Sequence, residues 1–303
     1  MEYRYNYLNN FLKNKFDERT LKICIDGGFT CPNRDGKLST RGCIFCSEMG
    51  SGERLHGELG ITKQVLDTIK YKEDRANKFI VYFQNFTNTY DSVDNLKKKY
   101  DAALVDDRIV ALAIATRPDC IDEDVVKLIK SYSEKYYVWV ELGLQTIDNR
   151  IGNVINRCYT TEQYEAALKI LNDNGIDVVT HFMIGLPGET KEILEDEIKF
   201  INKHSIQGIK IHSTYIVKNT ALEKMYVNGE YEPITFEYYM DTLIHLITHL
   251  KKDIVIHRFS GDAPRDTLVA PEWTGHKKKV MNELNNRMER ENLYQGCKLE
   301  NVD

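Results

Sequence analysis

The sequence predicts an α/β fold, a partial (β/α) barrel of about six βα units followed by a C-terminal strand and helix extension. Strands and helical segments alternate along the chain, and the strands are apolar on one face only. Repeated βα units form parallel sheets with helices outside them. We expect a single domain over residues 1–303, with the barrel at about 20–230 and the extension at about 231–303.

Each predicted strand is a short run rich in β-branched and aromatic residues. The first lies near residues 21–26, and the others are at 79–84, 108–116, 137–145, 177–184, 208–216 and 253–259. Helical patterns lie between them, at residues 61–72, after Asp91, from Asp122, from Thr160, from Thr190 and from Thr235 to Leu250. Carboxylate and hydroxyl side chains at such starts are typical of helix N-termini.

The alternation within the strands favours a barrel over a doubly wound sheet. Val138, Val140, Leu142 and Leu144 alternate with Trp139, Glu141, Gly143 and Gln145, and Val110, Leu112 and Ile114 alternate with alanines. A sheet covered on both faces would have strands that are apolar throughout. Burying residues such as Glu141 and Lys210 without partners would cost about 1–3 kcal/mol each. A barrel interior that holds a polar ligand avoids this cost.

The most chemically distinctive stretch is the loop at residues 27–48, which follows the first strand. Cys31 is followed by turn-forming residues and then by the C-x-x-C pair Cys43 and Cys46. Thiolates favour zinc, copper(I) or iron–sulfur clusters. A closed zinc site needs four ligands, with Cys24 or His56 as the fourth. A four-iron cluster on three cysteines would leave one iron open to a small molecule, and the loop alone leaves both alternatives open.

Composition limits the class of protein. The N-terminal segment has no apolar core or cleavage site typical of a signal peptide, and no apolar run is long enough to span a membrane. Seven dispersed cysteines favour a reducing cytoplasm over a secreted disulfide framework. The net charge of −5 does not indicate nucleic-acid binding. Local basic clusters, which taken singly are solvated faces, lie at Lys13–Lys22, at Arg34, Lys37 and Arg41, and at Lys277–Lys279.

Several motifs together resemble a known family. The loop from Cys31 to Cys46, with Phe45 before its last cysteine, resembles the cluster loop of radical S-adenosylmethionine (SAM) enzymes. Most of that superfamily spaces its cysteines C-x3-C-x2-C, whereas eleven residues separate Cys31 from Cys43 here. This long gap, and the segments 115–119, 140–146, 156–157 and 181–189, resemble the branch that contains the catalytic subunit of Elongator, which modifies tRNA wobble uridines. Residues 82–84 and 88–90 are similar to the bacterial family of the YtqA and YhcC proteins.

The resemblance implies a set of cofactor contacts. Cys31, Cys43 and Cys46 would each bind one iron of a 4Fe-4S cluster, and the fourth iron would bind S-adenosyl-L-methionine. An electron from the cluster would then generate a 5′-deoxyadenosyl radical. Further SAM-binding residues implied by the resemblance are Phe45, Gln84, Asn85, Arg117, Glu141, Gln145 and Arg157, with the Gly185–Gly188 turn near the nucleoside. Without the resemblance, Glu141 is better interpreted as the ion-pair partner of Arg117 and the turn as a plain turn.

The resemblance also implies a substrate. We expect a radical SAM enzyme that modifies the carbon-5 side chain of a tRNA wobble uridine, with an electron donor such as flavodoxin or ferredoxin. Because the barrel takes up nearly all 303 residues, we expect no acetyltransferase domain and favour remodelling of an installed side chain. The base would be splayed out of its loop. The alternatives are a radical SAM enzyme acting on a small metabolite, or a zinc-stabilised binding module without catalysis.

Overall fold

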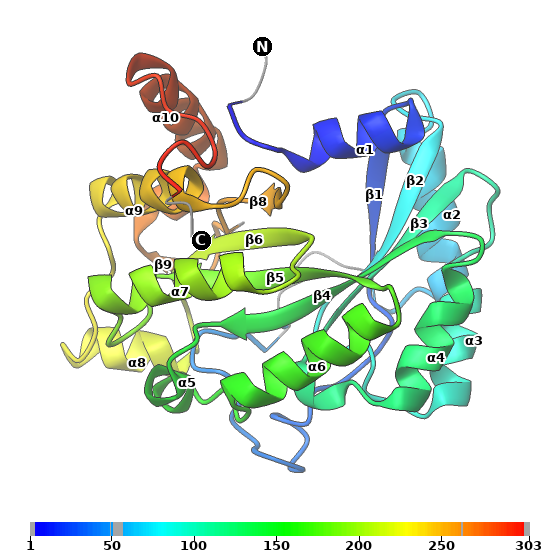
Figure 1. Cartoon of the computed structure of the whole chain (residues 1–303). Helices are drawn as coiled ribbons and strands as arrows, with labels where there is room; N and C mark the ends of the chain where they lie inside the picture. The colour runs from blue at the N-terminus through cyan, green and yellow to red at the C-terminus, as the bar shows by residue number, and fades with distance from the viewer. Residues whose placement is uncertain (1–3, 49, 51–56, 262, 300–303) are drawn as a thin grey trace.

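The computed structural model describes residues 4–48, 50, 57–261 and 263–299. Seven parallel strands form one sheet in the order β1-β2-β3-β4-β5-β6-β8, which curls into a half-barrel (Figure 1). The strands are β1 (Thr20–Ile25), β2 (Lys78–Phe83), β3 (Ile109–Thr116), β4 (Tyr137–Gln145), β5 (Asp177–Ile184), β6 (Gly208–Ser213) and β8 (Val255–Arg258). The predicted fold class, six βα units and a further C-terminal strand, is confirmed. The division into one domain with these boundaries stays a prediction.

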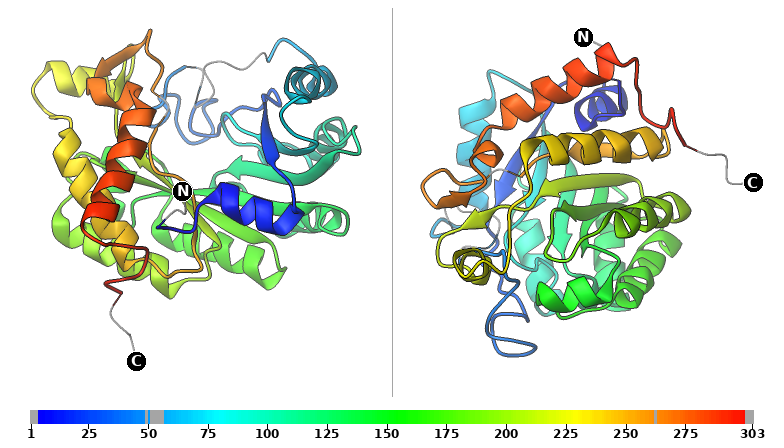
Figure 2. Two further views of the ribbon diagram at one scale, coloured as in Figure 1. Left: turned by 90° about the horizontal axis from the view of Figure 1, so that it is seen from above. Right: turned by 90° about the vertical axis from the view of Figure 1, so that its left-hand side faces the viewer.

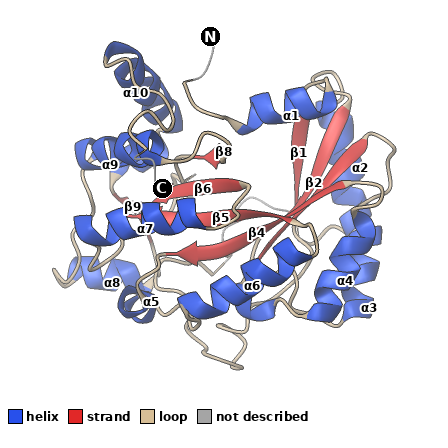
Figure 3. Ribbon diagram, in the orientation of Figure 1, coloured by secondary structure: helices blue, strands red, loops and turns tan. Residues whose placement is uncertain are grey.

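Helices cover the outer face of the sheet (Figure 3). The helices in the described residues are α1 (Leu8–Phe16), α2 (Ile61–Lys72), α3 (Val93–Asp101), α4 (Glu123–Tyr132), α5 (Asn149–Val154), α6 (Thr161–Asp173), α7 (Lys191–Lys203), α8 (Ala221–Val227), α9 (Phe236–His249) and α10 (Lys277–Arg290), with short 3-10 helices at Pro118–Cys120 and Glu272–Gly275. Of these, α1 lies at the amino end of the sheet and not on its outer face. Asp122, Thr160, Thr190 and Thr235 each accept a backbone N–H as the N-cap, which explains why those starts were predictable.

The predicted alternation of strand faces is confirmed in β4. Val138, Val140, Leu142 and Leu144 pack in the main core, and Trp139 packs in a second cluster inside the barrel. The prediction is wrong for Val110, which packs against the interior cluster although Leu112 and Ile114 face the helices. A register shift where β2 pairs with the start of β3 reverses the orientation at this point.

Helix α1 closes the amino end of the half-barrel, opposite the cysteine loop (Figures 1 and 2). It contacts both edge strands, β1 and β8, and Tyr7 pairs with Ile256. Leu8 and Leu12 pack into the interior cluster with Ala111, Ala113, Trp139 and other inward-facing residues. The interior is therefore apolar at the amino end, and only its central and carboxyl parts are polar.

A Leu12→Ala substitution is expected to lower the free energy of unfolding by about 2–5 kcal/mol, because it leaves a cavity against Trp139 and its neighbours. Urea unfolding of the purified protein measures this change. Asn14→Ala, on the exposed side of the same helix, is the control and should change the stability by less than about 0.5 kcal/mol. Equal effects of the two substitutions would contradict the assignment of α1 as a buried closing element.

The predicted strand at 208–216 divides into two. β6 ends at Ser213, and after a break the short strand β7 (Ile216–Val217) pairs antiparallel with β9 (Leu268–Ala270). This pairing directs the chain away from the sheet toward the C-terminal part of the fold. As a result, the residues at the end of β6 lie at the carboxyl edge of the barrel.

Candidate functional site

A cavity of about 230 Å³ lies inside the half-barrel at the carboxyl ends of its strands. Loops after parallel strands form the usual site face of such barrels. Its lining includes three cysteines from the loop after β1, and polar residues from β4, β5 and β6. The lining residues are Cys31, Arg34, Gly42, Cys43, Phe45, Cys46, Gly50, Phe86, Thr87, Ala115, Thr116, Arg117, Glu141, Gly143, Gln145, Tyr159, His181, Met183, His212, Ser213 and Tyr215.

The cysteine loop is held by its own backbone and by the segment after α5. The Arg34 N–H donates to the Cys31 carbonyl (2.8 Å), and the Cys46 N–H donates to the Cys43 carbonyl (3.1 Å). Two asparagines join the loop to its neighbour: the Asn33 side chain donates to the Asn156 carbonyl (2.6 Å), and the Asn156 side chain donates to the Gly42 carbonyl (2.7 Å). These bonds fix where the three thiols lie.

Arg34 braces the second half of the loop. Its guanidinium donates to the carbonyls of Cys46 (2.9 Å) and Ser47 and lies over the Phe86 ring, 5.6 Å from its centroid. Gly42 adopts φ +70°, and a Cβ there would lie 3.0 Å from the Arg34 Nε. A glycine at this position therefore lets the arginine cross the loop beside Cys43.

The three thiols fit a multinuclear cluster. None of the seven cysteines, all of which lie within the described residues, is in a disulfide. Burial, and then the neighbouring Cys46, raise the pKa of Cys43 to about 12, so ionisation of this thiol needs a cationic group at the site. The Asn33 amide nitrogen lies 3.6 Å from the Cys43 sulfur and would stabilise a thiolate.

A single zinc ion fits less well. Its ligands must converge on one point at about 2.0–2.3 Å, and no group of three His, Cys, Asp or Glu side chains in the described residues is arranged to hold one ion. Cys24 packs against the interior cluster and does not line the cavity. His56 lies outside the described residues. Cysteines that each bind a different iron need no common point, so the lining suits an iron–sulfur cluster.

A buried charge cluster forms the floor of the cavity. Glu141 is 1% exposed and accepts hydrogen bonds from Lys210, from His181 Nε2 (2.9 Å) and from Trp139 Nε1 (3.2 Å), while Lys22 Nζ lies 3.5 Å away. Burial disfavours the charged carboxylate, but Lys210, Lys22 and His181 outweigh it and hold the pKa of Glu141 well below its ordinary value of 4.5. The floor thus holds one buried carboxylate that is paired with two lysines and hydrogen-bonded to a histidine.

Two histidines, His181 and His212, lie next to this buried charge cluster. Because the Glu141 carboxylate only accepts hydrogen bonds, His181 donates to it through Nε2. The His212 ring lies 5.3 Å from the His181 ring. Burial, and then the neighbouring His181, hold the pKa of His212 well below its ordinary value of 6.5, so His212 is neutral at pH 7.

Comparison with known proteins decides the family. Residues 37–201 match the model of the Radical SAM superfamily, and residues 206–290 match that of the Radical_SAM C-terminal domain. The chain belongs to the radical SAM superfamily. Members of this superfamily use a 4Fe-4S cluster and SAM. Over 298 residues the chain is 35% identical to YtqA of Bacillus subtilis, covering 97% of this chain and 92% of YtqA.

One more relative and one solved structure are similar to this radical SAM protein. It is 31% identical over 181 residues to the tRNA uridine(34) acetyltransferase of Methanocaldococcus jannaschii, covering 58% of this chain and 32% of that protein. The structure of Elp3 from Methanocaldococcus infernus superimposes with a TM-score of 0.69 at 20% identity, covering 91% of this chain and 64% of that chain. Within the described residues, no helix is both long and apolar enough to span a membrane.

Among the residues predicted to bind SAM, Phe45, Arg117, Glu141 and Gln145 line the cavity of this radical SAM protein. The Tyr159 hydroxyl donates to Gln145 Oε1. A Cβ at Gly143 would lie 2.7 Å from Gln145 Nε2, so the glycine leaves space for this side chain. The alternative ion pair between Glu141 and Arg117 is wrong.

Arg117 pairs instead with Asp119 through two hydrogen bonds of 2.9 and 2.8 Å. Burial disfavours its charge, but the Asp119 carboxylate outweighs burial and raises the pKa of Arg117 above its ordinary value. Its guanidinium also donates to the Arg157 carbonyl (3.0 Å) and lies 4.8 Å from the Tyr159 ring centroid. Arg117 is therefore a rigid cation in the wall of the cavity.

Arg157 lies behind the cavity wall and does not line it. It is 0% exposed, and its guanidinium donates to five protein acceptors. These are the carbonyls of Tyr159, Leu144 and Thr146, the Asn149 side-chain oxygen and the Thr161 hydroxyl. Because a guanidinium has five N–H donors, Arg157 has none left for a SAM carboxylate. Its contacts organise the turn after β4.

Gln84 and Asn85 also lie outside the cavity lining, which includes the next two residues, Phe86 and Thr87. Asn85 is 2% exposed, adopts φ +72°, and donates to the Asp26 carboxylate at 3.3 Å. It therefore shapes the turn that places Phe86 in the cavity wall. Sequence reasoning did not assign Phe86, Tyr159, His181 or His212 to the SAM site, since only the folded chain brings these loop and strand residues to the cavity that the thiols line.

The Gly185–Gly188 turn does not line the thiol cavity. It is closed by Glu189, which accepts the Gly185 N–H (2.9 Å) and the Leu186 N–H (3.5 Å). The Tyr231 hydroxyl donates to the Gly185 carbonyl (2.6 Å). Burial raises the pKa of Glu189 to about 7. The turn is thus held in place by hydrogen bonds with Glu189 and Tyr231. Its contact with the nucleoside stays a prediction.

A pH-dependent stability is expected from Glu197, which accepts the Thr146 hydroxyl (2.6 Å) and the Ile147 N–H (3.1 Å) behind the same wall. Burial raises its pKa from 4.5 to about 8. The folded state then holds a proton that the unfolded state releases, so this contribution to stability is complete below pH 4.5 and is lost as the pH rises through 8. The loss is roughly 3–5 kcal/mol.

Glu197→Gln removes this titration, so its advantage over the wild type should grow between about pH 5 and 8. Urea unfolding at several pH values measures the difference between the two proteins. Glu192→Gln, an exposed change in the first turn of the same helix, is the control and should follow the wild-type profile over that range. A pH-independent difference between Glu197→Gln and the wild type would contradict the buried protonated carboxyl.

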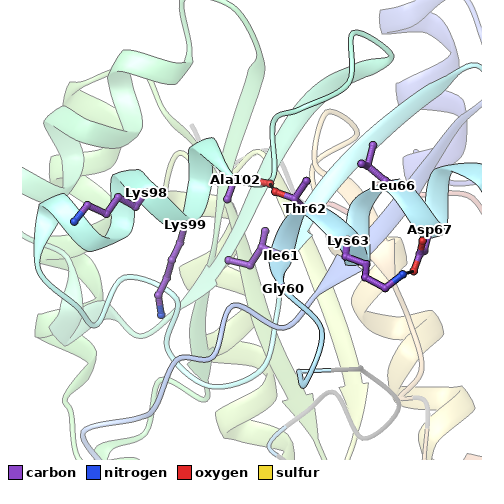
Figure 4. A pocket seen from close by; sticks show the side chains of 9 residues that line it. All are labelled: Gly60, Ile61, Thr62, Lys63, Leu66, Asp67, Lys98, Lys99 and Ala102. Carbon is purple, nitrogen blue, oxygen red and sulfur yellow. Dashed lines mark hydrogen bonds and ion pairs between the residues drawn. The ribbon is translucent and has the colours of Figure 1, made fainter.

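A larger hollow of about 650 Å³ lies outside the barrel, between α2 and α3 (Figure 4). Its lining residues are Gly60, Ile61, Thr62, Lys63, Leu66, Asp67, Lys98, Lys99 and Ala102. Lys63 pairs with Asp67 (2.8 Å), and Lys99 donates to the Gly27 carbonyl (2.8 Å). The hollow contains no thiol or imidazole, so size alone does not identify the functional site.

Proposed function

We propose that this protein is a radical SAM enzyme that modifies the carbon-5 side chain of a tRNA wobble uridine. The observation that carries the proposal is the convergence of Cys31, Cys43 and Cys46 on one cavity with a polar floor. The substrate is supported by the similarity to a tRNA uridine(34) acetyltransferase over 58% of this chain. That match covers 32% of the relative, so the proposal concerns radical chemistry and not acetyl transfer.

When bound, the cluster and SAM supply a 5′-deoxyadenosyl radical for hydrogen abstraction. The three cysteines would hold the cluster. Phe45, Arg117, Glu141 and Gln145 would contact SAM, because these predicted residues line the same cavity. Gln84, Asn85 and Arg157 would support the loops that carry them. The walls would exclude water from a reactive intermediate. A reducing cytoplasm and a flavodoxin or ferredoxin as electron donor complete the proposal.

The direct test incubates anaerobically reconstituted, reduced protein with SAM and tRNA from cells that lack this protein. Chromatography measures 5′-deoxyadenosine, and mass spectrometry of digested tRNA measures the wobble nucleoside. We expect tRNA to increase deoxyadenosine formation and the mass of that nucleoside to change. Deoxyadenosine formation that is unaffected by tRNA, with no nucleoside change, would favour a small-metabolite substrate. Protein that binds zinc and forms no deoxyadenosine would favour the alternative of a zinc-stabilised binding module without catalysis.

The tRNA surface is predicted to include exposed cations on the cysteine loop and at the start of α10. Lys37, Arg41 and Lys278 are exposed, whereas Arg34 is engaged within the loop. Reversing Lys37 and Arg41 to glutamate should weaken tRNA binding about tenfold and reduce the salt dependence of log Kd by about 1–2. Fluorescence anisotropy at several salt concentrations measures both. Lys127→Glu, on α4, is the control, and an equal effect there would contradict this surface.

A further inference from the structure

The cysteine loop has a tip that does not line the cavity. Eleven residues separate Cys31 from Cys43, whereas the spacing of most radical SAM proteins has three at this place. The cavity lining includes Arg34 and Gly42, but none of residues 35–41. Figures 1 and 2 show the tip of this loop protruding from the rest of the fold. The extra length therefore forms a projection beside the cavity, where it can contact a macromolecule.

The backbone of this tip is held by its own hydrogen bonds. The Gly36 N–H donates to the Ser39 carbonyl (3.2 Å), and the Leu38 N–H donates to the Pro32 carbonyl (2.8 Å). Gly36 adopts φ +95°, which favours glycine and allows the chain to turn sharply. Because Pro32 directly follows Cys31, the bond from Leu38 ties the tip to the first predicted cluster ligand. The tip is thus a preformed turn.

The preformed turn presents an apolar side chain between two cations. Leu38 is 49% exposed, and Lys37 and Arg41 are exposed beside it. The carboxylate of the tip, Asp35, accepts the Lys37 N–H (3.1 Å). A single exposed leucine is ordinary on a protein surface, but this leucine projects on a braced loop between positive charges. Proteins that distort nucleic acids insert such apolar side chains between bases, while cations bind the phosphates.

We propose that Leu38 enters the base stack of the anticodon loop and displaces the wobble base toward the cavity, while Lys37 and Arg41 bind phosphates. This inference rests on the proposed tRNA function and extends it, since it assigns the residue that makes a stacked base accessible. The cavity lies inside the half-barrel. An enzyme that acts on a base from such a position must first take the base out of its stack.

The test uses an anticodon stem-loop with 2-aminopurine in place of the base that follows the wobble uridine. The fluorescence of 2-aminopurine is weak in a stack and rises when the neighbouring base leaves it. Fluorescence and anisotropy are measured on cluster-loaded wild type and Leu38→Ala with SAM and without a reductant. We expect the wild type to raise the fluorescence at saturation, and Leu38→Ala to lose most of this rise. The affinity of Leu38→Ala should fall by less than about threefold, because both cations remain.

The matched control is Leu66→Ala, which truncates a leucine of similar exposure (44%) on α2. Leu66→Ala should keep the wild-type fluorescence rise, and so should Leu38→Met, whose long apolar side chain can still enter a stack. Iron content and urea unfolding show that each variant is folded and loaded.

A full fluorescence rise with Leu38→Ala, or an equal loss with Leu66→Ala, would overturn the inference while tRNA binding, and with it the proposed function, stands. A wild type that binds the RNA without any rise would overturn the inference in the same way. Loss of the rise in Leu38→Met would show that an apolar side chain is not what acts. If the wild type binds no RNA, both the inference and the tRNA function fail.

Discussion

A Cys43→Ala variant is expected to form 5′-deoxyadenosine at less than about one-hundredth of the wild-type rate, since loss even of residues that support metal ligands typically costs 10–100-fold. Burial and the neighbouring thiols Cys46 and Cys31 all raise the pKa of Cys43, so both thiols lie near enough to interact with it. Removing it leaves two cysteines, which cannot hold the cluster as proposed. The iron content should fall from about four atoms per chain to a small fraction of that value.

The comparison variant is Cys120→Ala. Cys120 is half-buried, lies in the turn after β3, and does not line the cavity. The Cys120→Ala variant should therefore retain the wild-type iron content and rate of deoxyadenosine formation. Iron analysis and chromatography under anaerobic conditions are made on all three proteins. Wild-type activity in Cys43→Ala, or equal losses in the two variants, would exclude the proposed ligand set.

Glu141→Gln is expected to destabilise the protein by about 3–5 kcal/mol, because it leaves Lys210 without its buried counter-charge. Lys22 is less affected, since its side chain is 23% exposed and reaches water. Glu134→Gln, an exposed substitution, should change stability by less than about 0.5 kcal/mol. Urea unfolding at pH 7 measures the three free energies.

The double variant Glu141→Gln with Lys210→Met separates charge loss from packing loss. Replacing a whole buried ion pair by apolar groups is often neutral, so the double variant should recover to within about 1–2 kcal/mol of the wild type. A double variant as unstable as the single one would show that the carboxylate acts through shape or hydrogen bonds to Trp139 and His181. The ion pair between Glu141 and Lys210 would then not explain the loss of stability in Glu141→Gln.

The strands were predictable because their signal is local. Val138 to Leu144 alternate with inward residues within one strand, and the caps at Thr160 and Thr190 need only three or four neighbouring residues. Helix α1 is different. α1 has only two buried residues, Leu8 and Leu12, and their partners are inward-facing side chains on distant strands. No local periodicity contains that information.

The cysteines and four of the predicted SAM contacts were placed at the cavity by motif and spacing. The sequence could not show the Glu141 partners, because Lys210 lies two strands away and reaches the carboxylate only when the sheet curls. Nor could it show that all five N–H donors of the Arg157 guanidinium are used within the protein. The five acceptors become neighbours only after the turn at residues 144–161 has folded. Motif recognition identifies important residues more readily than their individual roles.

Helix α1 also affects the order in which ligands are handled. It joins the two edge strands and fills the amino end with Leu8 and Leu12, so the cavity is reached from its carboxyl end. A nucleic acid seated across that rim would block the entrance. If tRNA is the substrate, as proposed, SAM would bind before the RNA, and the spent nucleoside would leave after it. Closure of the amino end by α1 would then impose an order on ligand binding.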